Sequence, residues 1–163
     1  MMNLTQSNLE IFDSTFENVE SNYFISMMAN PNSNYSATLQ NISYNISNFF
    51  TEMMFFSDIN VKIVNSTFEN NSCHFILYAT SSAYIGTYSI TLQNIKIKRN
   101  NILYYGIGIL YGIINLSLDS FEYNGNVNLD GEAFRVDNHS GGNITFLNSV
   151  VFRNNYVGKN YKK

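Results

Sequence analysis

Short alternations of apolar and polar residues recur along the whole chain and predict β-strands. In the segment 61–64, Val61 and Ile63 alternate with Lys62, and the same period of two runs through the segment 90–93. A helix would need apolar residues at spacings of three and four, and no long segment shows that spacing. An all-β chain is therefore expected.

The alternating segments are copies of one motif. Two alternating apolar residues precede an Asn, and another apolar residue and often a second Asn follow. Six copies begin at Leu9, Ala37, Val61, Ile90, Ile114 and Ile144. Their starts lie 28, 24, 29, 24 and 30 residues apart, which suits coils of three short strands and three turns. We therefore predict a β-solenoid of about six coils, with residues 1–163 as one domain or as a segment of a longer solenoid.

An Asn or Asp follows the first strand of most copies, where the chain must turn without a loop. Asn is the best non-glycine residue for the left-handed conformation of such a turn, and stacked amides can hydrogen-bond from coil to coil. The expected ladder is Asp13, Asn41, Asn65, Asn94 and Asn148. We expect Asn41 and Asn65 to be buried. In the fifth copy Leu118 interrupts the ladder, and a slip of one residue would supply Asp119 instead, so the register there stays open.

The second strand of each copy is expected to point one side chain into the coil. Because successive coils have nearly the same cross-section, these side chains should stack. The expected core stack is Phe16, Tyr44, Phe68, Ile97, Phe121 and Val151. A third strand is expected around residues 23–27, 53–56, 75–78, 106–111 and 131–136.

The run VNSTFENN at 64–71, followed by a short third strand, resembles the repeats of right-handed parallel β-helix proteins, the pectin-lyase-like superfamily. The run GEAFRV at 131–136 is similar to a third strand common there. The resemblance covers about residues 8 to 155 and implies a right-handed single-stranded parallel β-helix. It implies little about function, because the superfamily includes polysaccharide lyases and hydrolases, phage tailspikes and adhesins. In its Asn-rich repeats the chain is most similar to uncharacterised surface proteins of ciliate-like protists.

Catalytic signatures of that superfamily are missing from the sequence. The N-T-D, G-H-G and R-I-K motifs of polygalacturonase-like members do not occur, and the five Asp residues are scattered over several coils. The best polar cluster consists of Asp130, Glu132, Arg135, Asp137 and His139. Asp130 and Glu132 could form the facing carboxylates of a glycosidase, about 5–10 Å apart. A solvated polar edge is the simpler interpretation, and we expect no catalytic residue.

Metal sites have equally weak support in the sequence. The segment 126–137 mimics an EF-hand loop, but its first position is Asn and its last is Asp rather than Glu. An ordinary turn fits it better. His74 and His139 lack the companions of a zinc site. No metal and no cofactor are expected.

Charge and composition limit the partners. The net charge is −3 and only 13% of residues are charged, so no basic patch suits a nucleic acid. The most apolar stretch, 102–114, is too short for a membrane span. Cys73 is the only cysteine, which excludes an intrachain disulfide and predicts a buried thiol. No signal peptide is visible, although nine N-x-S/T sequons weakly favour export.

These observations predict a non-catalytic structural or adhesive module of an extracellular or cell-surface protein. Unpaired backbone groups at the ends of a solenoid favour self-association through coil ends or contact with flanking β-helix coils. The alternative is a carbohydrate-binding or polysaccharide-degrading β-helix protein. In that case a glycan would stack on exposed aromatic side chains, for which the candidates are Tyr78, Tyr84, Tyr104, Tyr105 and Tyr111.

Overall fold

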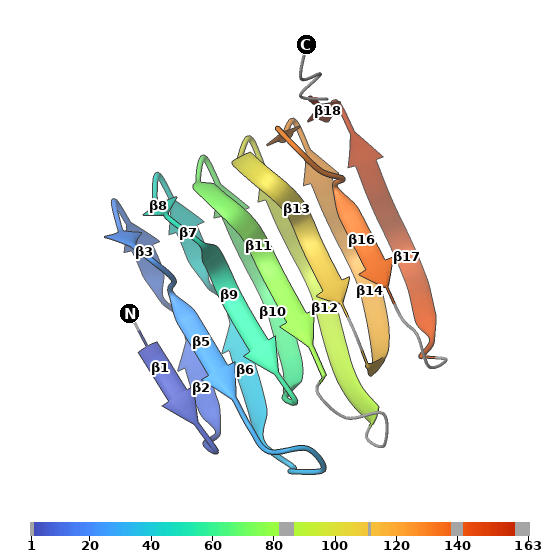
Figure 1. Ribbon diagram of the computed structural model, residues 1–163. Coiled ribbons are helices and arrows are strands. Elements are labelled where there is room, and N and C mark those ends of the chain that lie inside the picture. The colour runs from blue at the N-terminus through green and yellow to red at the C-terminus, as the bar shows by residue number, and fades with distance from the viewer. Residues whose placement is uncertain (1, 82–86, 111, 138–141, 159–163) are drawn as a thin grey trace.

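A computed structural model describes residues 2–81, 87–110, 112–137 and 142–158 (Figure 1). The described part is all-β, with 71% of the residues in strands and no helix. Parallel strands stack into a β-solenoid of about 5 turns. Figure 1 shows the coils following one another along a single axis, with the N-terminal coil at one end and the C-terminal coil at the other.

One side of the solenoid is a sheet of eight strands. Its six rungs are β2 (Leu9–Phe12), β6 (Ser36–Gln40), β10 (Asn60–Glu69), β12 (Thr87–Lys98), β14 (Ile113–Asn124) and β17 (Ile144–Arg153), and β3 (Thr15–Glu17) and β7 (Ser43–Asn45) extend the first two. The six sequence copies are therefore the six rungs of this sheet.

The opposite sheet has ten strands in two rows. One row contains β4 (Glu20–Ser21), β8 (Asn48–Phe49), β11 (Ser72–Thr80), β13 (Asn101–Leu110), β15 (Val127–Asn128) and β18 (Tyr156–Val157). The other row contains β1 (Met2–Thr5), β5 (Ile25–Met28), β9 (Glu52–Ser57), β16 (Phe134–Asp137) and the second halves of β11 and β13.

Left-handed residues turn the chain at two corners of each coil. At the first corner φ lies between 49° and 56°, at Asp13, Asn41, Asn65, Asn94, Ser120 and Asn148. At the second corner φ lies between 50° and 66°, at Asn18, Ile46, Asn70, Arg99, Gly125 and Asn154. A single residue with positive φ bends a strand sharply without a loop, which allows consecutive strands to enclose a narrow interior.

The core fills that interior with stacked rows of apolar side chains. Leu39, Ile63, Leu92 and Leu118 are in register in four successive rungs, and each is at most 2% exposed. Full burial of one such side chain contributes about 1.5–3 kcal/mol. The period of two seen in the sequence thus separates the core from the surface.

The register corrects the fifth copy of the repeat. Leu116, not Ile114, pairs with Ile90 and with Ile144, so this copy begins two residues later than expected. Its corner residue is Ser120, and neither Leu118 nor Asp119 takes that place. Leu118 instead lies in the core, fully buried.

The core stack also changes at its last two positions, each for its own reason: the fifth by the shift of the fifth copy, the sixth by an irregularity in β17. Phe16, Tyr44, Phe68 and Ile97 occupy one row, and Tyr123 and Phe152 continue it. Phe121 is buried one row away, beside Ile95 and Val150. Val151 pairs with Glu122, because β17 has an irregularity next to Asn148 that shifts its later residues.

Candidate functional site

The expected ladder lies on the surface of the first corner. Asn41 Nδ2 donates to Asp13 Oδ1 at 2.6 Å, and Asn94 Nδ2 donates to Asn65 Oδ1 at 3.0 Å. Asn148 Nδ2 donates to Asp119 Oδ1 at 2.6 Å, because Ser120 takes the ladder position in that coil.

All five expected ladder residues are exposed. The expectation that Asn41 and Asn65 are buried was therefore wrong. Their side chains lie on the outer, convex side of the corner, where water competes for their hydrogen bonds. The half-exposed Asp119 is likewise an outer residue rather than a buried carboxylate.

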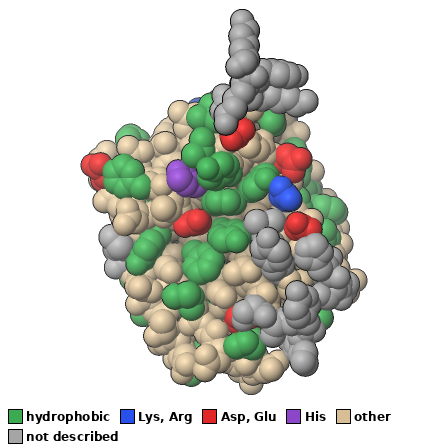
Figure 2. Space-filling view, in the orientation of Figure 1, with side chains coloured by type: hydrophobic (Ala, Val, Ile, Leu, Met, Phe, Trp, Pro, Cys, Tyr) green, Lys and Arg blue, Asp and Glu red, His purple; other side chains and the backbone are tan. Residues whose placement is uncertain are grey.

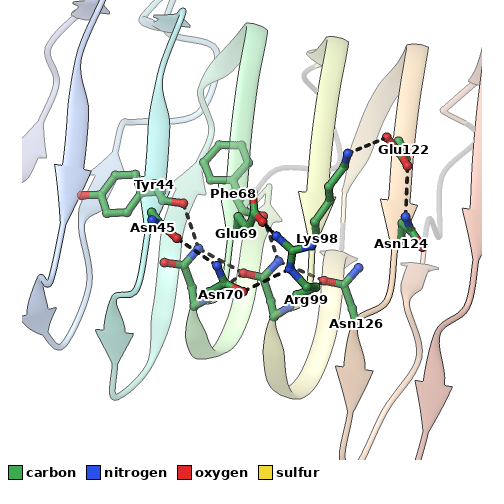
Figure 3. Close-up of polar contacts among 12 residues, drawn as sticks. Tyr44, Asn45, Phe68, Glu69, Asn70, Lys98, Arg99, Glu122, Asn124 and Asn126 are labelled. Atoms are coloured by element: carbon green, nitrogen blue, oxygen red, sulfur yellow. Dashed lines mark hydrogen bonds and ion pairs between the residues drawn. The ribbon is translucent and has the colours of Figure 1, made fainter.

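A second ladder, which was not expected from the sequence, lies inside the second corner, where Figure 3 labels its member Asn126. It consists of the buried Asn71, Asn100 and Asn126 and the partly buried Asn155, each directly after a left-handed residue. Asn71 and Asn100 join side chain to side chain at 3.0 Å, and Asn100 and Asn126 at 2.9 Å. The signal was present in the sequence as a corner residue followed at once by Asn.

Each buried amide also satisfies the backbone. Asn100 Oδ1 accepts the backbone N–H of Asn71 at 2.8 Å, and Asn100 Nδ2 donates to the carbonyl oxygen of Phe68 at 2.9 Å. Asn126 repeats this arrangement with Asn100 and Ile97. A buried N–H or C=O without a partner is costly, so this ladder holds neighbouring coils together.

The EF-hand-like segment 126–137 is built into the same network. Asn128 is fully buried, accepts a hydrogen bond from the Tyr123 hydroxyl at 2.8 Å, and donates to two backbone carbonyl groups. With Asn126 in the buried ladder, two of the oxygen donors that a calcium loop would need are engaged in the fold. Within the described residues, no three His, Cys, Asp or Glu side chains form a group that could hold a metal ion.

The expected polar cluster is only partly assembled. Phe134 and Val136 pack against the core, so Arg135 points outward from β16. Arg135 Nη2 lies 3.5 Å from Asp137 Oδ2, and Arg135 Nη1 donates to the Tyr105 hydroxyl at 2.6 Å. Asp130 and Glu132 are exposed. His139 lies outside the described residues.

An aromatic strip crosses the outer face of the ten-stranded sheet. It consists of Phe55, Phe75, Tyr78, Tyr104 and Tyr105. Its ring centroids lie 5.0 to 5.8 Å apart, the spacing of favourable ring contacts. Tyr84 and Tyr111 lie outside the described residues. Figure 2 shows hydrophobic side chains gathered on this face, with basic and acidic side chains around them.

Polar groups flank the strip on both sides. The Arg135 guanidinium lies 5.3 Å from the centre of the Tyr105 ring, within cation–π distance. The His74 ring meets the Tyr104 ring edge to face at 5.3 Å. Next to His74 is a shallow hollow of about 290 Å³, lined in part by Asn48, Phe50 and Leu129. Aromatic rings beside amides and a hollow can bind a flat, polar ligand.

Cys73 borders this hollow but is itself buried, as expected from the sequence. Burial raises the pKa of the Cys73 thiol far above its ordinary value. A thiol that stays protonated is a poor nucleophile, so Cys73 contributes packing rather than chemistry.

In the last coil, side chains are exposed at positions that are buried in the preceding coil. Ile144, Phe146 and Phe152 of β17 are 43%, 57% and 43% exposed, although they pair with the buried Leu116, Leu118 and Tyr123. Because β17 is the last rung of its sheet, one edge of its backbone also faces outward. The same core rows are less exposed at the N-terminal rung, where Leu9, Ile11 and Phe16 are partly buried.

No family model, no curated protein and no solved structure matches this chain. The described part contains no helix long and apolar enough to cross a membrane.

Proposed function

We propose that this chain is a non-catalytic structural or adhesive module of an extracellular or cell-surface protein, and that it assembles through the ends of its solenoid. The observation that carries the proposal is the open C-terminal coil, with Ile144, Phe146 and Phe152 exposed in core rows. Large exposed apolar surface beside an unpaired strand edge is typical of an interaction site.

The two amide ladders support a structural role. The side chains of both ladders form hydrogen bonds between coils, as at Asn71, Asn100 and Asn126. The Asn-rich coils also support membership of the right-handed β-helices of the pectin-lyase-like type. The nine sequons and the low charge favour an extracellular location.

Light scattering after size-exclusion chromatography, over a dilution series, tests the assembly. We expect the weight-average mass to rise with concentration above 18.6 kDa, the mass of one chain. A mass that stays at the value of one chain at every concentration would contradict assembly through the ends.

Carbohydrate binding is the second candidate function, because the aromatic strip lies on an exposed sheet face. Sugar rings stack on aromatic faces, and Tyr104 and Tyr105 are placed for such contact beside Arg135 and His74. On a glycan array, Tyr104→Ala is expected to abolish any binding. The control is Phe12→Ala, which removes an exposed aromatic ring from the other sheet.

Polysaccharide cleavage would require a different site. The residue to test is Glu132, an exposed carboxylate three residues before Arg135, whose guanidinium contacts Tyr105 of the aromatic strip. Glycan hydrolysis that is lost in Glu132→Ala would favour the enzyme alternative over both binding proposals.

A further inference from the structure

We infer that the two ends of the solenoid are complementary, and that copies of this chain stack head to tail, with the N-terminal coil of one copy on the C-terminal coil of the next. This inference rests on the proposed assembly through the ends. It adds the partner, which is a second copy, the direction of stacking and the residues in contact.

The winding of the chain is in phase across such a contact. Each row of the two sheets contains six strand segments. The first strand, β1, is at one end of a row, and β16 is at the other end of the same row. The last described strand, β18, ends the neighbouring row, which the chain passes through just before the row of β1 and β16 in every coil. A second copy therefore places its β1 next to β16, its β2 next to β17 and its β4 next to β18, continuing every row with parallel strands.

Apolar side chains match in this arrangement. Ile144, Phe146 and Phe152 lie in the rows that begin with Leu9, Ile11 and Phe16. Those three N-terminal residues are only partly buried, so both ends have core residues without a full set of neighbours. Stacking would cover both sets at once, and apolar area removed from water is the main driving force of association.

The contact would also extend the aromatic row. Within the chain, the rings of Phe16 and Tyr44 stack at 4.8 Å with an interplanar angle of 13°. Phe152 ends the same row at the other end of the molecule. Across a head-to-tail contact it would meet Phe16 of the second copy at the neighbouring rung.

Charge favours head-to-tail stacking over other arrangements. Residues 2–20 contain four carboxylates and no Lys or Arg, whereas Arg153 is the only charged side chain in the described C-terminal stretch 142–158. Arg153 lies in the row that begins with Glu17, so these two residues would become neighbours. Two like ends would instead bring like charges together, which destabilises a strand pair.

One feature of the buried ladder makes this contact weaker than the contacts between coils of one chain. In the head-to-tail contact, Asn155 would lie next to Val19 of the second copy. The Val19 side chain cannot accept a hydrogen bond from the Asn155 backbone N–H, as the Asn side chains do for the coil before them. The stack is therefore expected to be reversible and to dissociate on dilution.

Sedimentation velocity of a matched pair of variants tests the inference. Phe146→Asp places a carboxylate in the proposed interface, and Ile46→Asp places one at the second corner of an inner coil, between β7 and β8. Both residues are exposed in the single chain, at 57% and 58%, so neither change should prevent folding. We expect Phe146→Asp to raise the concentration at half-assembly by on the order of tenfold or more, and Ile46→Asp to leave it nearly unchanged.

Charge reversal tests the direction of stacking. Glu17→Arg and Arg153→Glu should each weaken self-assembly, by about twofold to fivefold. An equal mixture of the two should assemble better than either alone, because each contact between the two different variants joins opposite charges.

The outcomes separate the two claims. A wild-type chain that never assembles would overturn both the proposed function and this inference. A wild type that assembles equally well with Phe146→Asp, or a mixture that gains nothing, would overturn head-to-tail stacking while leaving assembly in place.

Discussion

At the scale of single residues, two consecutive positions at the second corner turn the chain and join it to the neighbouring coils. The first, such as Asn70 or Arg99, adopts positive φ and turns the chain. The second, Asn71 or Asn100, points inward and hydrogen-bonds to the coils on both sides. Turning the chain and satisfying the buried backbone are thus assigned to separate residues.

Replacing a buried ladder residue should therefore cost much more than replacing an exposed one. Asn100→Ala leaves the buried N–H of Asn71 and the C=O of Phe68 without their partners, and we expect a loss of about 2–4 kcal/mol in the free energy of unfolding. Asn94→Gly keeps the positive φ of the exposed ladder and should cost less than about 1 kcal/mol. Urea unfolding of both variants measures the difference, and equal losses would contradict the distinction between the ladders.

Two tyrosines of the same core row should respond in opposite directions to loss of the hydroxyl. The Tyr44 hydroxyl is buried and has no hydrogen-bond partner in the described structure, and burial raises its pKa well above the ordinary value. Tyr44→Phe is therefore expected to stabilise the fold by about 1 kcal/mol. Tyr123→Phe should destabilise it by about 1–2 kcal/mol, because it removes the hydrogen bond to Asn128.

Thermal unfolding checks this pair, because about 1 kcal/mol shifts Tm by roughly 2–4 °C for a chain of this size. A lower Tm for Tyr44→Phe would mean that its hydroxyl has a partner.

The residues that turn the chain could be predicted only where they are Asn or Asp, the types that favour positive φ. Asp13, Asn41, Asn65 and Asn94 follow alternating strands and do adopt positive φ. Ser120 and Ile46 do as well, although neither residue type favours that conformation, so their corners had no sequence signal. The buried ladder begins with Val19 and Ser47 instead of Asn, which hides its regularity in the first coils.

At the scale of elements, the register of each strand decides which side chains reach the core. In the fifth copy, the run from Ile114 to Leu118 alternates throughout, so a shift by two residues leaves the pattern of inward side chains unchanged. The alternation therefore predicts that β14 is a strand, but it does not determine the register of β14. The pairing of Leu116 with both Ile90 and Ile144 settles it.

Strand packing also depends on glycine where a neighbour comes too close for a side chain. At Gly106 of β13, an added Cβ would lie 2.6 Å from the Ala133 carbonyl oxygen and would collide with the Tyr123 ring. At Gly108 the nearest atom would be in the Phe75 ring, at 3.1 Å. The first position has no free space, whereas the second has a side chain that can move slightly.

We therefore expect Gly106→Ala to destabilise the fold by about 1–3 kcal/mol, and Gly108→Ala to have a smaller effect. Chemical unfolding of the two variants provides the comparison. A neutral Gly106→Ala would contradict the close packing of β13 against Tyr123 and Ala133.

At the scale of the whole molecule, a solenoid closes its sides but leaves its ends open. The sequence was sufficient to predict the stacked coils, since the repeat can be read from the spacing of its strands. The sequence did not reveal which end is more open or which rows meet there, because both depend on the register of β14 and β17. With that register, the apolar and charged residues of the two ends are in matching rows.

Formation of a disulfide between copies tests head-to-tail stacking most directly. Glu10 and Thr145 are exposed and lie at the two ends of one row. In a head-to-tail contact their Cα atoms would lie about 4.8 Å apart, a separation that a disulfide can span. Cys73 is buried and should not compete.

The measurement is the yield of covalent dimer after mild oxidation of Glu10→Cys, of Thr145→Cys, and of their equal mixture. Head-to-tail stacking predicts a high yield in the mixture and little in either variant alone, because like ends do not meet. Dimer that forms from Thr145→Cys alone as readily as from the mixture would contradict it.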